Sequence, residues 1–226
     1  AISFAMPLDK KLIRAYLAKK LPNGRSNFEK HMFDLYIRIW RIEKELVVLL
    51  QKKGFKGAAF FPNNKFREDI PGWRLKVVPE LCLRYVAVAS GVGSFGWSGN
   101  VGIKDYGTTI LLGAVVTDAV LEPSDPIPEE ESFCNDCKLC ARVCPLKMFS
   151  DKEAFTFKMG GREYSYAKRI DIRRCIIGCM GLTGLHHSGK FSTWSPGRFE
   201  YPEDEDEVTR LLVHSSITTC LLYTSD

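Results

Sequence analysis

Apolar residues recur every three or four positions over two early stretches of the chain, and this spacing predicts two helices. The first covers residues 8–21. The second begins near Ser26, which forms a capping box with Glu29, and ends before Gly54. Its apolar stripe is expected to face the core and comprises Phe28, Met32, Leu35, Ile39, Ile42, Leu46, Leu49 and Leu50.

Short runs of β-branched and apolar residues predict three strands, at residues 1–7, 57–61 and 108–117. A further helix is expected at residues 77–89, with Cys82 inside it as a buried, inert thiol. Alternating apolar and polar residues around two consecutive glycines predict a hairpin over residues 155–166. A last short helix is expected at residues 170–180.

A proline-rich, acidic segment at residues 121–131 is typical of an extended linker and marks the predicted domain boundary. The chain has 226 residues, of which 45% are hydrophobic, so it can bury a substantial core. No apolar run reaches the ~18 residues that a membrane-spanning helix needs. The expected division is a core of residues 1–122, a second module of residues 123–202 and an acidic tail of residues 203–226.

The formal net charge is only +5, and the basic residues are spread out except for Lys168, Arg169, Arg173 and Arg174. This density does not indicate a nucleic-acid surface. Two alternatives remain for the basic residues: a solvated face, or a docking face for an acidic electron donor such as a flavodoxin or ferredoxin. Eight cysteines without a secretion signal indicate a reducing cytoplasm.

The most informative motif is a dense cysteine run at residues 134–145, which reads C-x2-C-x2-C-x3-C-P. Bacterial-type ferredoxins hold [4Fe–4S] clusters with this spacing, and the fourth cysteine ligates a second cluster. Zinc is the alternative, although structural zinc sites pair C-x2-C with a distant second pair. The motif therefore predicts iron–sulfur ligands at Cys134, Cys137, Cys140 and Cys144.

The second informative stretch is rich in glycine and runs from residue 90 to residue 102. It contains G-x-G-x-x-G, but no helix is expected after it, so a dinucleotide site of the Rossmann type is rejected. Either the backbone approaches a flat ligand closely, or the stretch is a hairpin that needs positive φ angles. The candidate cofactor-binding residues are Gly91, Gly93, Ser94, Phe95, Gly96, Trp97, Ser98, Gly99 and Asn100.

The order of these motifs resembles the cobalamin- and iron–sulfur-dependent reductases that include epoxyqueuosine reductase and the respiratory reductive dehalogenases. The glycine segment at residues 87–99 is similar to the A-x-x-x-G-L-G-x-x-G segment of that superfamily. Residues 106–123 are similar to its Y-G run followed by L-G-x-x-x-T-D-x-x-L-E-P. After the ferredoxin motif, Arg173, Arg174 and Cys175 are similar to its R-R-C, which supplies a later cluster ligand.

The resemblance implies an α+β fold, with a nitroreductase-like α/β core followed by a ferredoxin-like iron–sulfur module. It also implies that the core binds cobalamin, with flavin as the alternative, and that the clusters pass single electrons to it. Cys179 would complete the first cluster, while Cys144 and Cys175 would provide half of a second. That second site would be either empty or completed by Cys82, by a histidine such as His186, or by residues that this sequence does not include.

Departures from the superfamily leave the reaction open. Its later C-x2-C-x3-C-P motif is missing after Cys179, and a matching catalytic acid is not found. Tyr106 is the candidate proton donor, with a buried structural tyrosine as the alternative. The function is expected to be a reductase acting on a small or nucleoside-like substrate, or an electron-transfer or corrinoid-activating protein without its own substrate.

Both ends of the sequence are expected to depart from a natural chain. The superfamily's N-terminal segment is absent, so a truncated gene product is expected. Residues 220–226 resemble translated adapter sequence, and we expect the final dozen residues to be foreign, which discounts Cys220 as a ligand.

Overall fold

The computed structural model describes residues 1–18, 24–62, 66–71, 78–144 and 147–170, and a few positions between 204 and 210. Contacts along the chain divide these residues into two compact units. The first unit contains the described residues up to 138 together with Ala154–Tyr166. The second contains the described parts of Leu139–Glu153 and the described residues from 167 onward. The predicted division at residue 122 stays a prediction.

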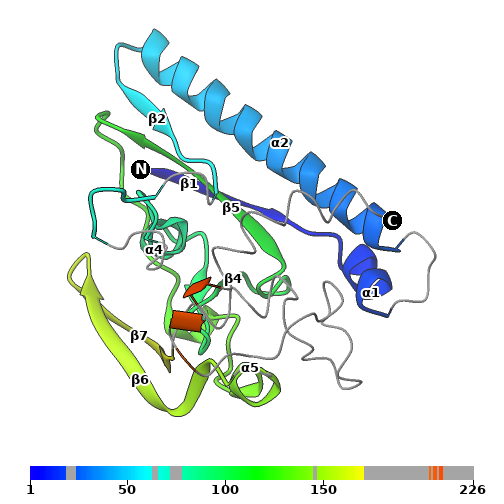
Figure 1. The fold of residues 1–226 in the computed structure, drawn as a ribbon. Coiled ribbons are helices and arrows are strands. Elements are labelled where there is room, and N and C mark those ends of the chain that lie inside the picture. The colour runs from blue at the N-terminus through cyan, green and yellow to red at the C-terminus, as the bar shows by residue number, and fades with distance from the viewer. Residues whose placement is uncertain are drawn as a thin grey trace. The chain divides into compact units, whose positions relative to one another are not determined.

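A three-stranded antiparallel sheet is the frame of the first unit (Figure 1). Its order is β1 (Ile2–Pro7), β5 (Ile110–Thr117) and β2 (Gly57–Ala59). In the register, Ile2 lies opposite Val115, and Gly57 lies opposite Thr117. The three strands predicted from the sequence are therefore present. β2 is shorter than expected, since it ends at Ala59 and the predicted strand ends at residue 61.

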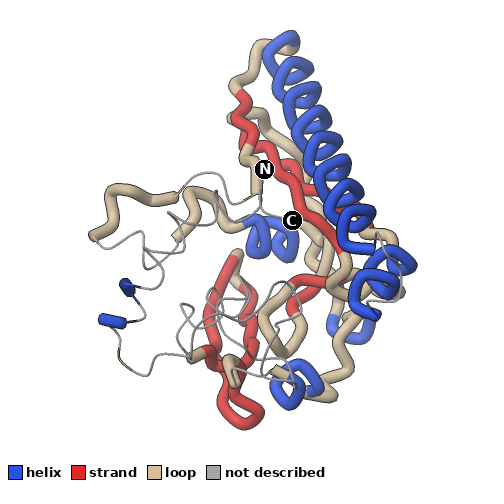
Figure 2. Tube along the Cα trace, turned by 45° about the vertical axis from the view of Figure 1, so that its right-hand side comes forward, coloured by secondary structure: helices blue, strands red, loops and turns tan. Residues whose placement is uncertain are grey.

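Helices cover both faces of this sheet, as the views in Figures 1 and 2 agree. On one side, α1 (Lys10–Ala18) leads into the long helix α2 (Gly24–Lys52), which packs on β5 and β2. On the other side, α4 (Leu83–Ala89) packs on β5 and β1. α2 begins two residues before the predicted capping box, and it ends as expected before Gly54, whose φ is +86°.

The prediction for Cys82 was wrong in its position. Cys82 is the residue that precedes α4, with an extended backbone, and it is half-buried. The helix expected within residues 77–89, after Pro79, begins at Leu83. The thiol therefore lies at the N-terminal end of α4 and not inside the helix.

The stripe on α2 faces the sheet largely as its spacing predicts. Phe28, Leu35, Ile39 and Leu50 are all buried to 7% exposure or less. Leu49 is an exception, because half of its surface is exposed. Between Ile39 and Leu50, one core-facing position of α2 is occupied by an acidic residue, Glu43, which is completely buried.

Glu43 is buried because it completes the hydrogen bonding of the central strand. In β5, the carbonyl of Ala114 accepts the N–H of Phe60 at 3.2 Å, just beyond the end of β2. The N–H of Ala114 points the same way and donates to Oε1 of Glu43 at 3.1 Å. Oε2 of Glu43 has no hydrogen-bond partner among the described residues. Burial raises the pKa of this carboxyl, which favours its neutral form.

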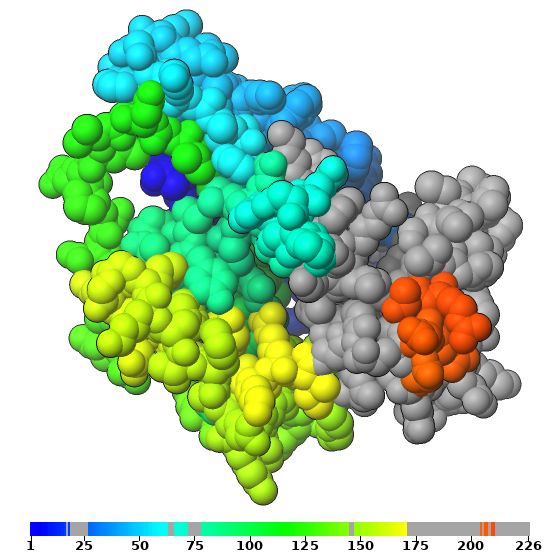
Figure 3. Space-filling view, turned by 60° about the vertical axis from the view of Figure 1, so that its left-hand side comes forward, coloured from blue at the N-terminus to red at the C-terminus, as the bar shows by residue number. Residues whose placement is uncertain are grey.

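The remaining described elements are short, apart from one hairpin. β3 (Ser94–Phe95) pairs with β4 (Val101–Gly102), and a 3-10 turn covers Glu129–Glu131. α5 (Leu139–Val143) precedes the hairpin of β6 (Phe149–Met159) and β7 (Arg162–Arg169). The tip of the hairpin belongs to the first unit and its open ends to the second. Figure 3 shows the hairpin, in yellow, open to solvent on this face.

The hairpin is longer than its sequence pattern predicts, and its turn has a simple cause. Gly160 and Gly161 both have positive φ angles, as a two-residue turn of type I′ requires. No helix in the described part of the chain is long and apolar enough to cross a membrane. The helix expected at residues 170–180 lies outside the described residues. The described elements combine helices with antiparallel sheets, and the nitroreductase-like core and ferredoxin-like module stay predictions.

The buried carboxyl of Glu43 predicts an unusual pH dependence of stability. Because its pKa is raised, the folded protein keeps this proton where the unfolded chain has lost it. The stabilising contribution is complete below the ordinary pKa of 4.5 and is lost as the pH rises towards the folded pKa. We expect the urea midpoint of Glu43→Gln to depend less on pH above this value than that of the unaltered chain.

The matched control for this experiment is Glu45→Gln, two positions along the same helix, where the side chain is exposed. It should retain the pH dependence of the unaltered chain. Glu43→Ala should lose roughly 2–4 kcal/mol of unfolding free energy at pH 5, because it leaves both a cavity and an unpaired N–H. Identical pH profiles for the unaltered chain and Glu43→Gln would show that folding does not raise the pKa of this carboxyl.

Candidate metal centre and cavities

The first half of the cysteine motif lies in a loop that is tied to the glycine-rich segment. The N–H of Cys134 donates to Oγ of Ser132 at 3.2 Å, and this hydroxyl bonds with Oγ of Ser94 at 2.9 Å. The N–H of Trp97 donates to Sγ of Cys134 at 3.4 Å. Backbone N–H groups directed at sulfur help set the potential of iron–sulfur clusters. Cys134 therefore has a polar setting that suits a cluster ligand.

The backbone between the first three cysteines is curled by two residues in the left-handed region. Asp136 has a φ of +56° and Lys138 a φ of +55°. Such angles cost energy in residues other than glycine, so their presence indicates a loop whose shape is imposed by its surroundings. Lys138 contributes to this shape, since its Nζ lies 4.2 Å from the centre of the Trp97 ring and 3.8 Å from Oδ2 of Asp136. The thiol of Cys137 is exposed.

The second half of the motif belongs to the second unit. Cys140 is the second residue of α5, and Cys144 follows directly after the end of that helix. Both thiols are half-buried. The N–H of Lys147 donates to the carbonyl of Cys144 at 3.1 Å, and Lys147 has a φ of +52°. This bond holds Lys147 next to Cys144, the residue that follows α5.

The donor set suits an iron–sulfur cluster chemically, but the described residues do not form a closed ligand group. None of the five described cysteines is in a disulfide. Nowhere in the described part of the chain do three or more Cys, His, Asp or Glu side chains gather as metal ligands. The expected ligands Cys175 and Cys179, and His186, lie outside the described residues. The fit therefore rests on four thiols at the right spacing and on the N–H donor to Cys134.

The glycines of the neighbouring segment lie against the protein's own atoms. An added Cβ at Gly96 would lie 2.7 Å from Cζ of Phe133, and one at Gly102 would meet the same ring. A Cβ at Gly93 would lie 2.7 Å from the carbonyl oxygen of Gly102. A Cβ at Gly91 would overlap the carbonyl oxygen of Asp125 in the linker. The absence of side chains at these positions is thus explained by close packing within the chain.

This packing answers the question that the sequence left open for the glycine segment. Gly91 and Gly99 both have a φ of +69°, and β3 pairs with β4 across the segment. The segment is a hairpin that needs positive φ angles, filled on one side by Phe133. The predicted backbone cradle for a flat cofactor does not fit these residues, because Phe133 and the linker occupy the space next to the glycines.

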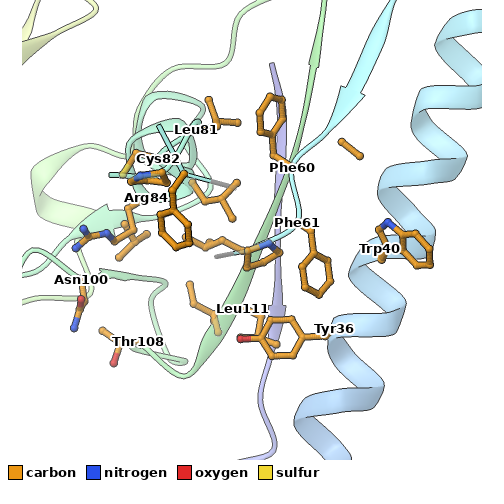
Figure 4. Close-up of a pocket in the computed structure, with 18 of the residues that line it drawn as sticks. Tyr36, Trp40, Phe60, Phe61, Leu81, Cys82, Arg84, Asn100, Thr108 and Leu111 are labelled. Carbon is orange, nitrogen blue, oxygen red and sulfur yellow. The ribbon is translucent and has the colours of Figure 1, made fainter. Parts of the chain in front are cut away.

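Two cavities lie beside this hairpin within the first unit. The first has a volume of about 700 Å³ and is lined mainly by aromatic and aliphatic residues (Figure 4). Tyr36 and Phe61 form one wall with ring centres 5.5 Å apart, and burial raises the pKa of Tyr36. Arg84 lines the other side, where Nη1 donates to the carbonyl of Gly99 at 2.9 Å. Cys82 also lines this cavity.

The second cavity has a volume of about 540 Å³ and contains most of the predicted cofactor-binding residues. Gly93, Ser94, Phe95, Gly96 and Trp97 line it. Cys134 and Asp136 of the cysteine loop, and Arg162 and Tyr164 of the hairpin, also contribute to its wall. Asn100 lines the first cavity instead, while Gly91, Ser98 and Gly99 line neither of the two. Both volumes lie in the range of about 300–1,000 Å³ that small-molecule sites occupy.

Tyr106, the candidate proton donor, lies in an exposed turn. It is 46% exposed, in a turn closed by the bond from the N–H of Gly107 to the carbonyl of Ile103. Nζ of Lys10 lies 5.7 Å from the centre of its ring. It lines neither of the two cavities. The alternative of a buried structural tyrosine does not describe it, and its role as a proton donor stays a prediction.

A pair of tyrosines that the sequence did not single out contacts Phe95, a residue that lines the second cavity. The hydroxyls of Tyr85 and Tyr166 are 2.8 Å apart within a cluster of aromatic rings that includes Phe95 and Phe157. Burial, followed by the bond to Tyr166, raises the pKa of Tyr85. Only pairing in space shows this contact, because the two residues are 81 positions apart.

No protein-family model matches the chain. It is similar to the epoxyqueuosine reductase of Atelocyanobacterium thalassa (isolate ALOHA), with 36% identity over 61 residues. This match covers 27% of the chain and 19% of the relative. It is also similar to the epoxyqueuosine reductase of Synechocystis sp. (strain ATCC 27184 / PCC 6803 / Kazusa), with 31% identity over 86 residues, 33% of the chain and 29% of the relative. The matches thus span less than a third of either relative.

The packing of Phe133 predicts a specific coupling with Gly96. Gly96→Ala should lower the unfolding free energy by about 1–3 kcal/mol, because the new methyl group overlaps the ring. Phe133→Leu should cost less in the Gly96→Ala background than in the unaltered chain, since the smaller side chain makes room. Urea unfolding of the four proteins in the absence of added cofactor measures this coupling. Strictly additive costs would mean that the ring does not fill this space.

Proposed function

We propose that the chain is part of an iron–sulfur oxidoreductase of the epoxyqueuosine reductase type. The observation that carries this proposal is the C-x2-C-x2-C-x3-C-P run, together with the similarity to two epoxyqueuosine reductases. The N–H of Trp97 directed at Sγ of Cys134 supports a thiolate ligand at this position. The proposed fold is a nitroreductase-like core joined to a ferredoxin-like module.

The proposed cluster is [4Fe–4S], with Cys134, Cys137 and Cys140 as three of its proposed ligands. Cys179 is the proposed fourth ligand. Cys144 would then belong to a second site with Cys175. Of the residues that could complete this second site, Cys82 is the described one, and it lines the aromatic cavity of the first unit.

The proposed electron acceptor is an organic substrate, epoxyqueuosine-like or organohalide-like, reached through a cofactor in the core. The cavity of about 540 Å³ suits a small or nucleoside-like molecule and includes Cys134 in its wall. For this molecule, Arg162 is the available cation, although its Nη2 is paired with Oδ1 of Asp125 at 3.0 Å. Tyr164 offers an aromatic ring in the same wall.

Cobalamin, and flavin as its alternative, stay predictions from the sequence resemblance. Of the glycines expected to hold either one, Gly91 meets the linker, Gly93 meets Gly102 and Val101, and Gly96 meets Phe133, so the expected mode of binding does not fit. We therefore assign no step of the reaction to either cofactor. A cytoplasmic setting and an acidic electron donor such as flavodoxin or ferredoxin belong to the same proposal.

The exposed position of Tyr106 favours a second candidate function. This candidate proton donor is exposed and lines neither cavity. An electron-transfer or corrinoid-activating protein would need cluster ligands but no proton donor of its own. Turnover of an organic substrate by the purified, reduced protein would decide between the two functions.

The cluster proposal is tested by metal content after anaerobic purification. The unaltered chain should contain iron and acid-labile sulfide, about four of each for one cluster or about seven to eight for two. Cys137→Ser should lose the broad visible absorbance of the cluster, because a ligand thiolate is removed. Cys220→Ser is the matched control and should retain it. A colourless protein with stoichiometric zinc would refute the proposal. Iron loss in the control would refute the expectation that Cys220 is not a ligand.

A further inference from the structure

The cavity of about 700 Å³ is not the one proposed for the organic substrate, and it shares no lining residue with that smaller cavity. All of its lining residues belong to the first unit. It lies between α2, the residues that follow β2, the start of α4 and β5. The cavity therefore needs an account of its own.

The walls of this cavity are rich in aromatic rings. The rings belong to Tyr36, Trp40, Phe60, Phe61 and Phe66. Phe60 makes no ring–ring contact with another described residue, and the tilted pair of Tyr36 and Phe61 lies beside it along the wall. Aromatic rings attract one another in tilted or offset arrangements with centres about 4.5–7 Å apart. An aromatic guest is therefore the apolar molecule that these walls suit best.

A half-buried arginine lines the other side of the cavity. One N–H of Arg84 donates to the carbonyl of Gly99 at 2.9 Å, and none of the described carboxylates forms an ion pair with this side chain. A guanidinium has five N–H donors in a planar fork, which matches the paired oxygens of a carboxylate or phosphate. The other N–H groups of Arg84 are thus available to an acid group in the cavity.

Three further polar side chains of the lining lack a hydrogen-bond partner among the described residues. They are the hydroxyl of Tyr36, the amide of Asn100 and the hydroxyl of Thr108. Figure 4 shows Tyr36 reaching into the cavity from α2, with Arg84, Asn100 and Thr108 on the opposite side. A mostly apolar cavity with a few polar groups directed into it is the usual form of a small-molecule site.

The charges of the lining favour an anion. Lys44 and Arg84 both line the cavity, whereas no Asp or Glu does. Nζ of Lys44 lies 5.6 Å from the centre of the Trp40 ring, so a cation stands next to an aromatic wall. A molecule that is both aromatic and anionic would use both features at once.

Two acidic residues adjoin the lining along the chain, and neither cancels these cations. Glu43 precedes Lys44, but burial raises the pKa of its carboxyl and favours the neutral form. Glu80 lies between two lining residues, but it is exposed and its charge acts on Arg67. The positive charge of Arg84 is therefore left for a ligand.

We propose that this cavity binds a small aromatic acid, with the aromatic body among the rings and the acid group on Arg84. The inference goes beyond the proposed function, because it requires neither a cluster nor turnover. Carboxylates and phosphate esters share the chemistry that an arginine recognises. Probes of both kinds are therefore included in the test.

The first experiment compares an acid with its neutral analogue. Indole-3-acetate, 3-indolyl phosphate and indole-3-acetamide are each titrated into the unaltered protein at pH 7, and ligand-observed NMR gives the dissociation constants. At least one of the two acids should bind about tenfold more tightly than the amide, because it accepts charge-assisted hydrogen bonds. Equal affinity for the amide and both acids would overturn the proposal.

The second experiment assigns this preference to a residue. Arg84→Gln should weaken binding of the preferred acid about tenfold and change that of the amide less than twofold. Arg41→Gln is the matched control, because Arg41 is an exposed arginine of α2 that lines neither cavity. Urea midpoints of both variants check that they are folded. An unchanged preference in Arg84→Gln, or its loss in Arg162→Gln, would place the acid elsewhere and refute the site.

The third experiment locates the acid without any substitution. The half-buried thiol of Cys82 lines the same cavity and reports whether it is occupied. At ten times its dissociation constant the preferred acid fills about nine-tenths of its sites, so alkylation of Cys82 by iodoacetamide should slow about tenfold. Mass spectrometry of the peptide that contains Cys82 measures this rate. Binding without protection of Cys82 would contradict the proposal, whereas iron content tests the proposed function separately.

Discussion

The contact on which the candidate site depends is the packing of Phe133 against Gly96 and Gly102. The ring fills the space that a side chain would take at Gly96, directly after β3, and at Gly102 in β4. Because Phe133 immediately precedes Cys134, this packing fixes the start of the cysteine loop against the hairpin. The bond from the N–H of Trp97 to Sγ of Cys134 follows from that placement. Glycine at positions 96 and 102 therefore allows the packing that positions the thiol of Cys134.

This arrangement changes how the glycine segment relates to function. A glycine-rich stretch can bring bare backbone to a ligand, or it can bring backbone to another part of the same chain. Here the second applies at four glycines, and a cavity that Cys134 and Tyr164 help to line remains beside the hairpin. A molecule bound there would contact the wall of the cluster loop directly, without a cradle of glycine backbone around it.

The sheet imposes a different constraint at Glu43. β2 is too short to pair with the whole of β5, so the N–H of Ala114 would be left without a partner in the core. α2 supplies a carboxyl oxygen at the one position of its stripe where an apolar residue would leave that donor unsatisfied. The cost is a second buried oxygen without a partner among the described residues, which is tolerable when the acid is neutral.

The sequence by itself determined the main elements of the first unit and the chemistry that its cysteines can offer. Periodicity predicted α1, α2 and the strands β1, β2 and β5, because these elements bury one apolar side and their spacing records it. The cysteine spacing predicted the type of centre, since ligand number and order are local properties of the chain. Periodicity failed at Leu49 and Glu43, where the register of α2 on β5 decides which side chain is enclosed.

Only the tertiary structure decided between the two roles of the glycines. The Phe133 ring that fills the space beside Gly96 and Gly102 is more than thirty residues away from them in the sequence. The same holds for the contact between Tyr85 and Tyr166 and for the two cavities. Each of these depends on which distant segments meet, and a pattern read along one chain contains no record of such meetings. Residue types and spacing fix what a site can bind, whereas packing fixes which atoms remain open to bind it.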